Sequence, residues 1–320
     1  MARCDLGDRG GLADFREAIA LASEAGQGRE VALLHNNLAY ALAPIEGPVA
    51  AQELLQAGIA FAEARGLTEV ANQLTANRVE TLLETGEDEQ AFALAGEFAA
   101  GVEASGSVFE LSSVRSVQAR VLTLRGRAAE VADTLDWLEA TTREVGQVDL
   151  IIVNLGVAAQ SRAALGQHEQ AVALLAEIEA TPGSRENRNY PALLPAIVRT
   201  AVALGDPELA HQLVAGVERS TPYNEHALVT ASAALAEASG ELVAAAEGYG
   251  VAARRWQNFG VVPEQAFALL GQGRCLVQLG RTGEASPVLQ QARGIFQKLQ
   301  AAPALAETDE LLQQATAISS

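Results

Sequence analysis

The chain has 320 residues, of which 49% are hydrophobic and 4% aromatic, and its 22 basic and 40 acidic side chains give a net charge of −18. This charge repels phosphate backbones and anionic lipid headgroups, so it argues against direct nucleic-acid binding and a membrane-surface role. Two cysteines are too few for a disulfide framework, the first residues contain no signal-peptide core, and the uncharged apolar stretch 150–161 is shorter than the roughly 20 residues that span a bilayer. We therefore predict a cytoplasmic protein.

One phrase recurs along the whole chain: an apolar helical run, a turn residue, and a short polar step that leads into alanine. The turn residues of its seven copies are Glu46, Gly86, Gly126, Gly166, Gly205, Gly240 and Gly280. They are 40 residues apart, except for a spacing of 39 before the fifth turn and of 35 before the sixth. A period this regular predicts a helical repeat protein.

Small or β-branched residues flank each turn at fixed distances. Seven residues before the turn stand Ala39, Val79, Ala119, Ala159, Val198, Ala233 and Gly273, and five residues after it stand Ala51, Ala91, Val131, Ala171, Ala210, Ala245 and Ala285. The ninth residue after the turn is usually larger and apolar: Leu55, Ala95, Leu135, Leu175, Val214, Tyr249 and Leu289. Small residues on both sides of a turn let two antiparallel helices approach closely, and glycine suits the left-handed end of a helix. Each repeat is therefore predicted to be a helix, a turn and a second helix.

The two ends of the chain depart from the repeat. Residues 9–24 have the pattern of a second helix whose first helix is mostly missing, so we assign 1–24 to a partial first repeat. Seven hairpins then fill residues 25–300. Residues 301–320 are predicted to form a C-terminal capping helix and tail, because a helix over 303–318 would have a polar face.

The small and acidic residues of each copy carry a resemblance to a known family. Gly273, Gly280, Glu284–Ala285 and Ala292 resemble the tetratricopeptide repeat, and seven copies in phase extend this resemblance over nearly the whole chain. The resemblance implies an all-α, right-handed superhelical solenoid in which the first helix of each hairpin lines a concave groove.

The long repeat period points to a particular group of these proteins. The phrases at 35–42 and 269–285 resemble the C-terminal repeat region of bacterial MalT/LuxR-type regulators and of cyclase-linked signalling ATPases. In those families an NTPase domain precedes the repeats. This chain contains no phosphate-binding loop motif, because its only lysine, Lys298, follows a glutamine.

One column of residues on the first helices is mostly polar. Six residues before the turns stand Tyr40, Glu80, Arg120, Gln160, Arg199, Ala234 and Arg274. We expect Arg120, Gln160 and Arg199 to form a locally basic centre suited to a carboxylate, a phosphate or an acidic peptide. The alternative is an ordinary solvated helix face on which Glu80 and Arg120 pair. The candidate groove residues are Asn36, Tyr40, Asn77, Glu80, Arg120, Gln160, Arg199 and Arg274.

Other chemistry has weaker signals. The four histidines fall on different repeats, so no metal site is predicted. Cys275 lies in an interior-facing stretch and is assigned to the core, and the acidic run 87–89 is expected at the start of a helix, where the helix dipole stabilises it. Trp256 is either a packing residue or a surface anchor. The irregular segment 181–191 is either a plain connector or a loop that contacts a partner.

The predicted function is a non-catalytic scaffold that binds a protein or peptide in its groove within a bacterial signalling or transcription-regulatory system. The alternative is a small-effector sensing module of a larger ATP-dependent regulator, with an NTPase domain upstream. We expect no cofactor, no metal, no nucleic-acid or membrane partner, and no enzymatic activity.

Overall fold

The computed structural model describes residues 1–105 and 108–319, so residues 106–107 of the predicted hairpin region and Ser320 of the predicted tail lie outside it. Every regular element among the described residues is a helix, and many of the helices pack against the next helix along the chain. The prediction of an all-α helical-repeat solenoid is confirmed. No described helix combines the length and the apolar character that crossing a membrane requires.

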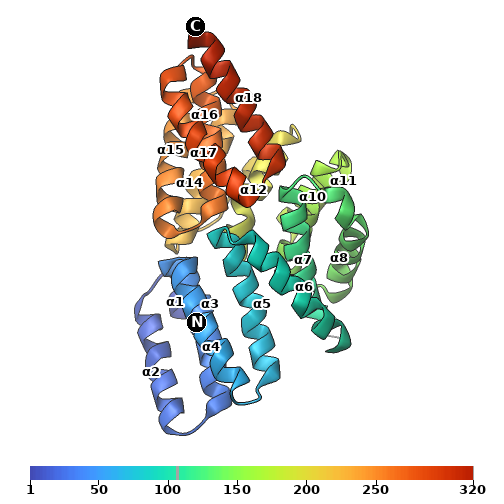
Figure 1. The fold of residues 1–320 in the computed structure, drawn as a ribbon, viewed down its shortest axis with the longest axis vertical. Coiled ribbons are helices and arrows are strands. Elements are labelled where there is room, and N and C mark those ends of the chain that lie inside the picture. The colour runs from blue at the N-terminus through green and yellow to red at the C-terminus, as the bar shows by residue number, and fades with distance from the viewer. Residues whose placement is uncertain (106–107, 320) are drawn as a thin grey trace. The chain divides into compact units, whose positions relative to one another are not determined.

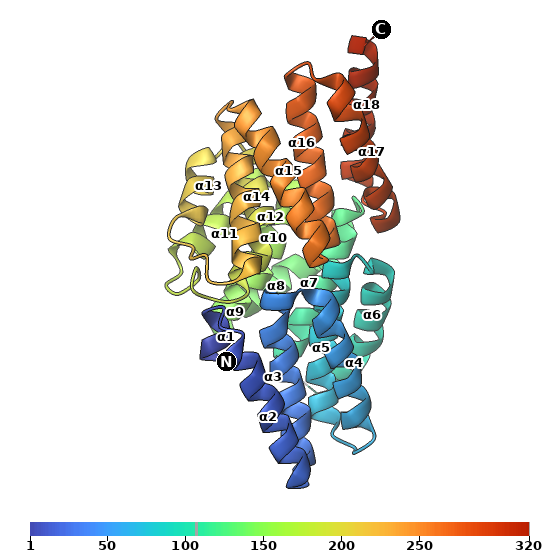
Figure 2. The same cartoon turned by 90° about the vertical axis from the view of Figure 1, so that its left-hand side faces the viewer.

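The chain divides into two compact units, which we describe separately. Unit 1 comprises residues 1–117 together with the short segments 219–225 and 259–261. Its helices are α1 (Ala2–Asp5), α2 (Gly10–Glu24), α3 (Gly28–Glu46), α4 (Pro48–Glu63), α5 (Thr68–Thr85), α6 (Asp88–Ser105) and the first part of α7 (Val108–Leu124). Helices α2 to α5 lie side by side as antiparallel neighbours (Figures 1 and 2).

Unit 2 comprises residues 118–218, 226–258 and 262–320. After the end of α7, its elements are η1 (Ala128–Val131), α8 (Ala132–Val145), α9 (Val148–Leu150), the π-helical turn η2 (Ile151–Leu155), α10 (Gly156–Ala164), α11 (His168–Ala180), α12 (Tyr190–Ala203), α13 (Pro207–Val214), α14 (Pro222–Ala238), α15 (Leu242–Phe259), α16 (Val262–Gln278), α17 (Thr282–Leu299) and α18 (Ala302–Ser319). Helices α16, α17 and α18 pack consecutively at its C-terminal end (Figure 1).

Glycines end the first helices where the repeat predicts them. The six predicted turn glycines from Gly86 to Gly280 all have positive φ, the conformation that caps a helix without steric cost. The first hairpin differs by one residue: α3 continues through Glu46, and Gly47 makes the turn with φ +97°. A Cβ on Gly47 would also lie 2.3 Å from the backbone oxygen of Phe259 within unit 1, so no other residue fits there.

The small residues that flank the turns are buried in all seven hairpins, as the close approach of two antiparallel helices requires. At Gly273 the helices come closest, because an added Cβ would meet the side chain of Leu289 at 2.3 Å. The residues nine positions after the turns, which lie between hairpins, are buried in every copy except at Val214. Val214 is the last residue of the eight-residue helix α13. This short second helix accounts for the spacing of 35 residues.

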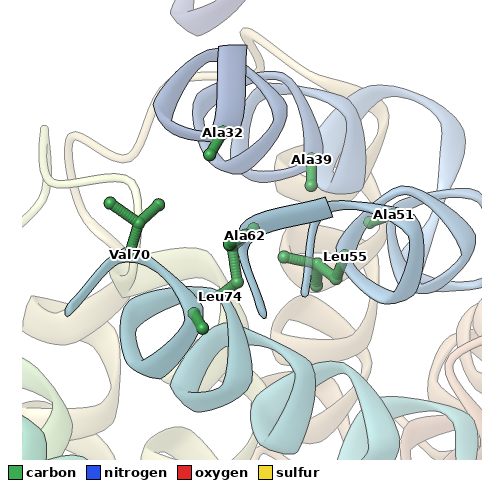
Figure 3. Close-up of a cluster of buried hydrophobic side chains, with 8 residues drawn as sticks. Ala32, Ala39, Ala51, Leu55, Ala62, Val70 and Leu74 are labelled. Carbon is green, nitrogen blue, oxygen red and sulfur yellow. The ribbon is translucent and has the colours of Figure 1, made fainter. Parts of the chain in front are cut away.

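The core of unit 1 shows how these columns pack. Ala39 of α3 and Ala51 of α4 face each other close to the turn, and Leu55 of α4 and Leu74 of α5 fill the space between the two hairpins (Figure 3). All four side chains are at most 1% exposed. The alternation of small residues within hairpins and leucines between them positions the first helices, which carry the candidate binding residues.

Candidate functional site: the polar faces of the first helices

In unit 1, two asparagines link the first helices of successive hairpins. The Asn77 side chain on α5 donates from Nδ2 to Oδ1 of Asn36 on α3, over 2.8 Å. Asn36 is only 4% exposed, whereas Asn77 is half-buried. Tyr40 and Glu80 are half-buried on the same two helices, one turn further along each. The structure therefore gathers four of the eight candidate residues on α3 and α5.

In unit 2, Arg199 of α12 is bound to a carboxylate of the protein itself. Its two terminal nitrogens donate to the two oxygens of Glu264 on α16, over 2.6 and 2.8 Å. The guanidinium carbon lies 4.2 Å from the ring centroid of Phe267, one turn further along α16. Arginine forks recognise carboxylates in this bidentate manner, and here the carboxylate is internal. Ala234, the small member of the polar column, lies on the intervening helix α14.

Arg274 of α16 lies between two carboxylates, one on the first helix α14 and one on the C-terminal helix α18. Nη1 donates to both oxygens of Glu237 on α14, over 2.8 and 3.0 Å, and Nε donates to Oε1 of Glu307 on α18, over 2.9 Å. The Tyr249 hydroxyl donates to Glu237 over 2.8 Å. Burial would lower the pKa of Arg274, but Glu237 and Glu307 outweigh it and raise this pKa. We call Glu237, Tyr249, Arg274 and Glu307 the Arg274 cluster.

The two remaining candidates lie on other helices of unit 2. The side chain of Gln160 on α10 donates to the backbone oxygen of Gly156 in the same helix, over 3.0 Å. Arg120 is half-buried on α7. The structure therefore places Arg120, Gln160 and Arg199 on three separate first helices and gives the third of them a tight internal partner.

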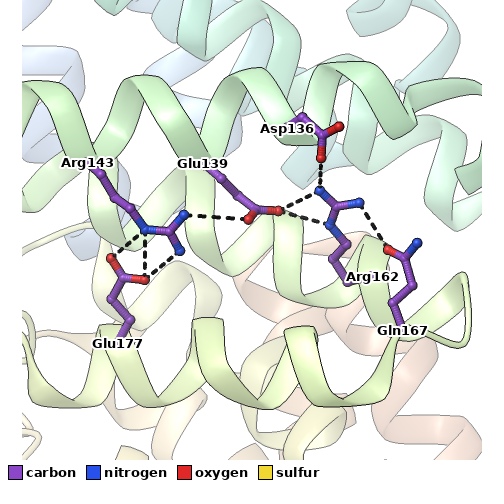
Figure 4. Close-up of polar contacts among 6 residues, drawn as sticks. All are labelled: Asp136, Glu139, Arg143, Arg162, Gln167 and Glu177. Atoms are coloured by element: carbon purple, nitrogen blue, oxygen red, sulfur yellow. Dashed lines mark hydrogen bonds and ion pairs between the residues drawn. The ribbon is translucent and has the colours of Figure 1, made fainter.

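A polar network that the repeat columns do not predict connects α8, α10 and α11. Arg162 is only 5% exposed, and it donates to Asp136, to Glu139 over 2.9 Å and to Gln167 over 3.0 Å (Figure 4). Arg143 bridges Glu139 to Glu177, with its Nη2 2.8 Å from a Glu177 oxygen. The one sequence signal for this network is that Arg162 is the only charged residue in the stretch 150–168.

The structure also decides several alternatives outside the polar column. Trp256 is fully buried and donates to the Thr230 hydroxyl over 2.8 Å, so it is a packing residue. Cys275 is buried in the core, where burial and then Glu237 raise its pKa to about 12, as expected for a packed thiol. The acidic run 87–89 lies at the start of α6, as predicted.

The segment between α11 and α12 is held in place by its own hydrogen bonds. Asn187 and Asn189 both donate to Asp149, over 2.6 and 3.3 Å, and the Tyr190 hydroxyl donates to the Leu213 carbonyl over 2.7 Å. Arg185 binds Glu179 and the Gln212 carbonyl. These contacts all lie within unit 2, as expected for a connector that packs on its own hairpins.

A small hollow lies between α15, α16 and α17 of unit 2. Its volume is about 410 Å³, and Leu276, Val288, Gln272, Glu247 and Arg281 contribute to its lining. This volume is at the lower end of the range for small-molecule sites. Across residues 1–105 and 108–319, no three His, Cys, Asp or Glu side chains group in a way that could hold a metal ion.

No protein-family model and no curated protein matches the chain. Among solved structures it is similar to a chain described as a circular tandem repeat protein with novel repeat topology and enhanced subunit contact surfaces, at 13% identity and a TM-score of 0.22, over 97% of this chain and 89% of that one. At so low a TM-score, the assignment to the helical-repeat class rests on the helices and turns described above.

Proposed function

We propose that this protein is a non-catalytic scaffold of tetratricopeptide-like hairpins that binds a peptide or protein segment along the polar faces of its first helices. The observation that carries the proposal is the Asn36–Asn77 pair. Asn77 uses its amide nitrogen to reach Asn36, and its own Oδ1 accepts no hydrogen bond from the described residues. A half-buried amide acceptor fixed on the scaffold suits the N–H of an extended peptide backbone.

The test compares two alanine variants of α5, Asn77→Ala and Thr75→Ala, with the wild-type protein. A partner is captured on the immobilised wild-type chain, identified, purified, and titrated against each variant. Asn77→Ala should weaken binding about three- to ten-fold, which corresponds to one hydrogen bond. Thr75→Ala is the control, because the Thr75 hydroxyl bonds only to Ala71 of its own helix. A purified partner that binds Asn77→Ala as tightly as wild type would remove the site from unit 1, and the absence of any direct binding would remove the scaffold function.

The hollow in unit 2 favours a second candidate function, the sensing of a small effector. It combines apolar walls from Leu276 and Val288 with the polar groups of Gln272 and Glu247. Binding of a metabolite there would raise the unfolding temperature in proportion to the logarithm of its concentration. Val288→Trp should abolish that rise by filling the hollow, and a rise that survives this substitution would place the ligand elsewhere.

We further propose that the scaffold works in a bacterial signalling or transcription-regulatory system, in the cytoplasm, together with an NTPase domain. Support comes from the resemblance of the repeat phrases to the C-terminal regions of MalT/LuxR-type and cyclase-linked ATPases. Reading the DNA upstream of the coding sequence in the same frame tests this proposal. A continuous frame with a phosphate-binding loop supports it, whereas a stop codon and ribosome-binding site immediately upstream contradict the fusion.

A further inference from the structure

The hollow of unit 2 has a counterpart in unit 1, because three consecutive helices begin at equivalent positions of the repeat. Helices α4, α5 and α6 begin at residues 48, 68 and 88, and α15, α16 and α17 begin 194 residues later, at residues 242, 262 and 282. Four residues that line the hollow are smaller than their unit 1 equivalents: Ala246 for Gln52, Gln272 for Arg78, Gly283 for Glu89 and Val288 for Leu94. The smaller side chains leave space between the helices of unit 2.

In unit 1, carboxamide groups of the chain itself lie at this place. The Gln52 side chain on α4 donates from Nε2 to Oε1 of Glu87, over 3.1 Å. With its amide oriented to satisfy both neighbours, Gln90 donates to the other oxygen of Glu87 over 3.1 Å and accepts from Arg78 over 3.2 Å. Unit 1 therefore shows that the space beside the turn accommodates amides that bind a carboxylate and a guanidinium.

Unit 2 lacks those two amides, because Ala246 and Glu284 stand in the places of the two glutamines. Gln272 of α16 is half-buried, and an added Cβ on Gly250 of α15 would lie 2.8 Å from its Nε2. The Gln272 amide makes no hydrogen bond to the described residues. A polar ligand group in the hollow would supply the partner that this half-buried amide lacks.

The charged groups that line the hollow favour a neutral ligand group. Arg281 donates from Nε and Nη2 to the two oxygens of Glu284, over 2.8 and 2.7 Å, so its charge is balanced. Glu247 of α15 adds an exposed carboxylate, which would repel a carboxylate ligand. An ammonium ligand has no acceptor for the N–H groups of Gln272, whereas a carboxamide offers both a donor and an acceptor.

We propose that the hollow of unit 2 binds a small ligand through a primary carboxamide, with an apolar part of the ligand against Leu276 and Val288. This inference rests on the second candidate function, the sensing of a small effector, and names the chemistry of that effector. The ligand amide donates to Glu247 and accepts from Gln272, as a glutamine of unit 1 donates to a carboxylate and accepts from a guanidinium. The ligand thus replaces the amides of the chain that unit 2 lacks.

The experiment compares three small molecules that share one branched apolar tail: isovaleramide, isovalerate and isoamylamine. Their dissociation constants for the full chain are measured at neutral pH by saturation-transfer NMR. Wild type should bind isovaleramide at least about five-fold more tightly than the carboxylate or the amine, the difference expected for one hydrogen bond. Equal binding of the three molecules, tighter binding of isovalerate or isoamylamine, or no binding of isovaleramide would overturn the inference.

Two variants test the place of binding. Ala246→Gln restores the glutamine of unit 1 and should weaken isovaleramide binding more than about ten-fold, because an amide of the chain then fills the hollow. Ala244→Gln, at an exposed position of the same helix, is the matched control and should change affinity less than about two-fold. Ala246 is 3% exposed, so Gln272→Met keeps the test decisive if Ala246→Gln does not fold by circular dichroism. Gln272→Met removes the amide and should reduce the preference for isovaleramide over isovalerate to less than about two-fold.

These outcomes separate the inference from the function on which it rests. Isovaleramide binding that survives both Ala246→Gln and Gln272→Met lies outside the hollow and overturns the inference. If isovaleramide does not bind while another metabolite raises the unfolding temperature in a Val288-dependent manner, only the carboxamide inference falls and effector sensing stands. If no metabolite does so, effector sensing falls as well, and the scaffold function that depends on Asn77 is unaffected.

Discussion

The two units join their first helices through different kinds of polar contact. In unit 1, an amide pair, Asn36 and Asn77, joins successive first helices without any ionised group. In unit 2, first helices are joined by arginine–carboxylate pairs, such as Arg199 with Glu264 and Arg274 with Glu237. The hairpin packing itself comes from small and leucine side chains in both units. The difference shows that the repeat fixes the positions of the helices, while the individual polar residues on the first helices decide whether the contact between two helices is neutral or ionic.

The largest expected effect on stability comes from the substitution of Arg162, which lies deepest in the charged network of unit 2. Arg162→Met should lower the free energy of unfolding by about 3 kcal/mol, because Glu139, whose side chain is 17% exposed, loses its closest charged partner. Urea unfolding followed by circular dichroism measures this change. The control is Arg281→Met, whose exposed pair with Glu284 should contribute nothing measurable. Equal small effects in both variants would show that the network of Figure 4 does not stabilise unit 2.

A core substitution tests whether apolar packing stabilises unit 1 about as much as the charged network stabilises unit 2. Leu74 is fully buried between the hairpins, so Leu74→Ala should lower the free energy of unfolding by about 2–3 kcal/mol through lost contacts and a residual cavity. The same urea titration applies, with Leu6→Ala as the control because Leu6 is 73% exposed. A loss below about 1 kcal/mol would mean that the cluster in Figure 3 relaxes around the cavity.

The sequence predicts the hairpins well because their determinants are local and periodic. The turn glycines and the flanking small residues act within one repeat, and each of the seven copies repeats the same signal. The partners of the arginines are different in kind. Glu264 lies 65 residues from Arg199, on the first helix of the second hairpin along, and in a different column of the repeat. No pattern within a single repeat identifies such a partner, so the expected basic centre did not include its internal carboxylate.

Arg162 shows the same limit, because its partners also lie on another hairpin. The sequence places it close to a turn in a stretch with no other charged residue, but Asp136 and Glu139 belong to the second helix of the preceding hairpin. Periodicity assigns each helix its buried face, and it does not show which polar residues of two neighbouring hairpins meet. The sequence could therefore predict the candidate site as a set of helix faces. Which of its residues already bind another side chain depends on contacts between hairpins, and these are seen only in the structure.

The smallest predicted effect tests the comparison through pH. A histidine is the residue to change, because the ordinary pKa values of arginine and of carboxylates lie outside the range from pH 7.5 to 5.5. Burial lowers the pKa of His35 in unit 1, and its Nδ1 is buried without a hydrogen bond, so a proton there would lack an acceptor. The unfolded chain binds that proton near pH 6.5, whereas the folded chain binds it only at lower pH. The free energy of unfolding should therefore fall between pH 7 and 5.5 in wild type, and the fall should be smaller in His35→Leu. Exposed His168 provides the control, since His168→Gln should keep the wild-type dependence, and an unchanged slope in His35→Leu would show that His35 does not cause it.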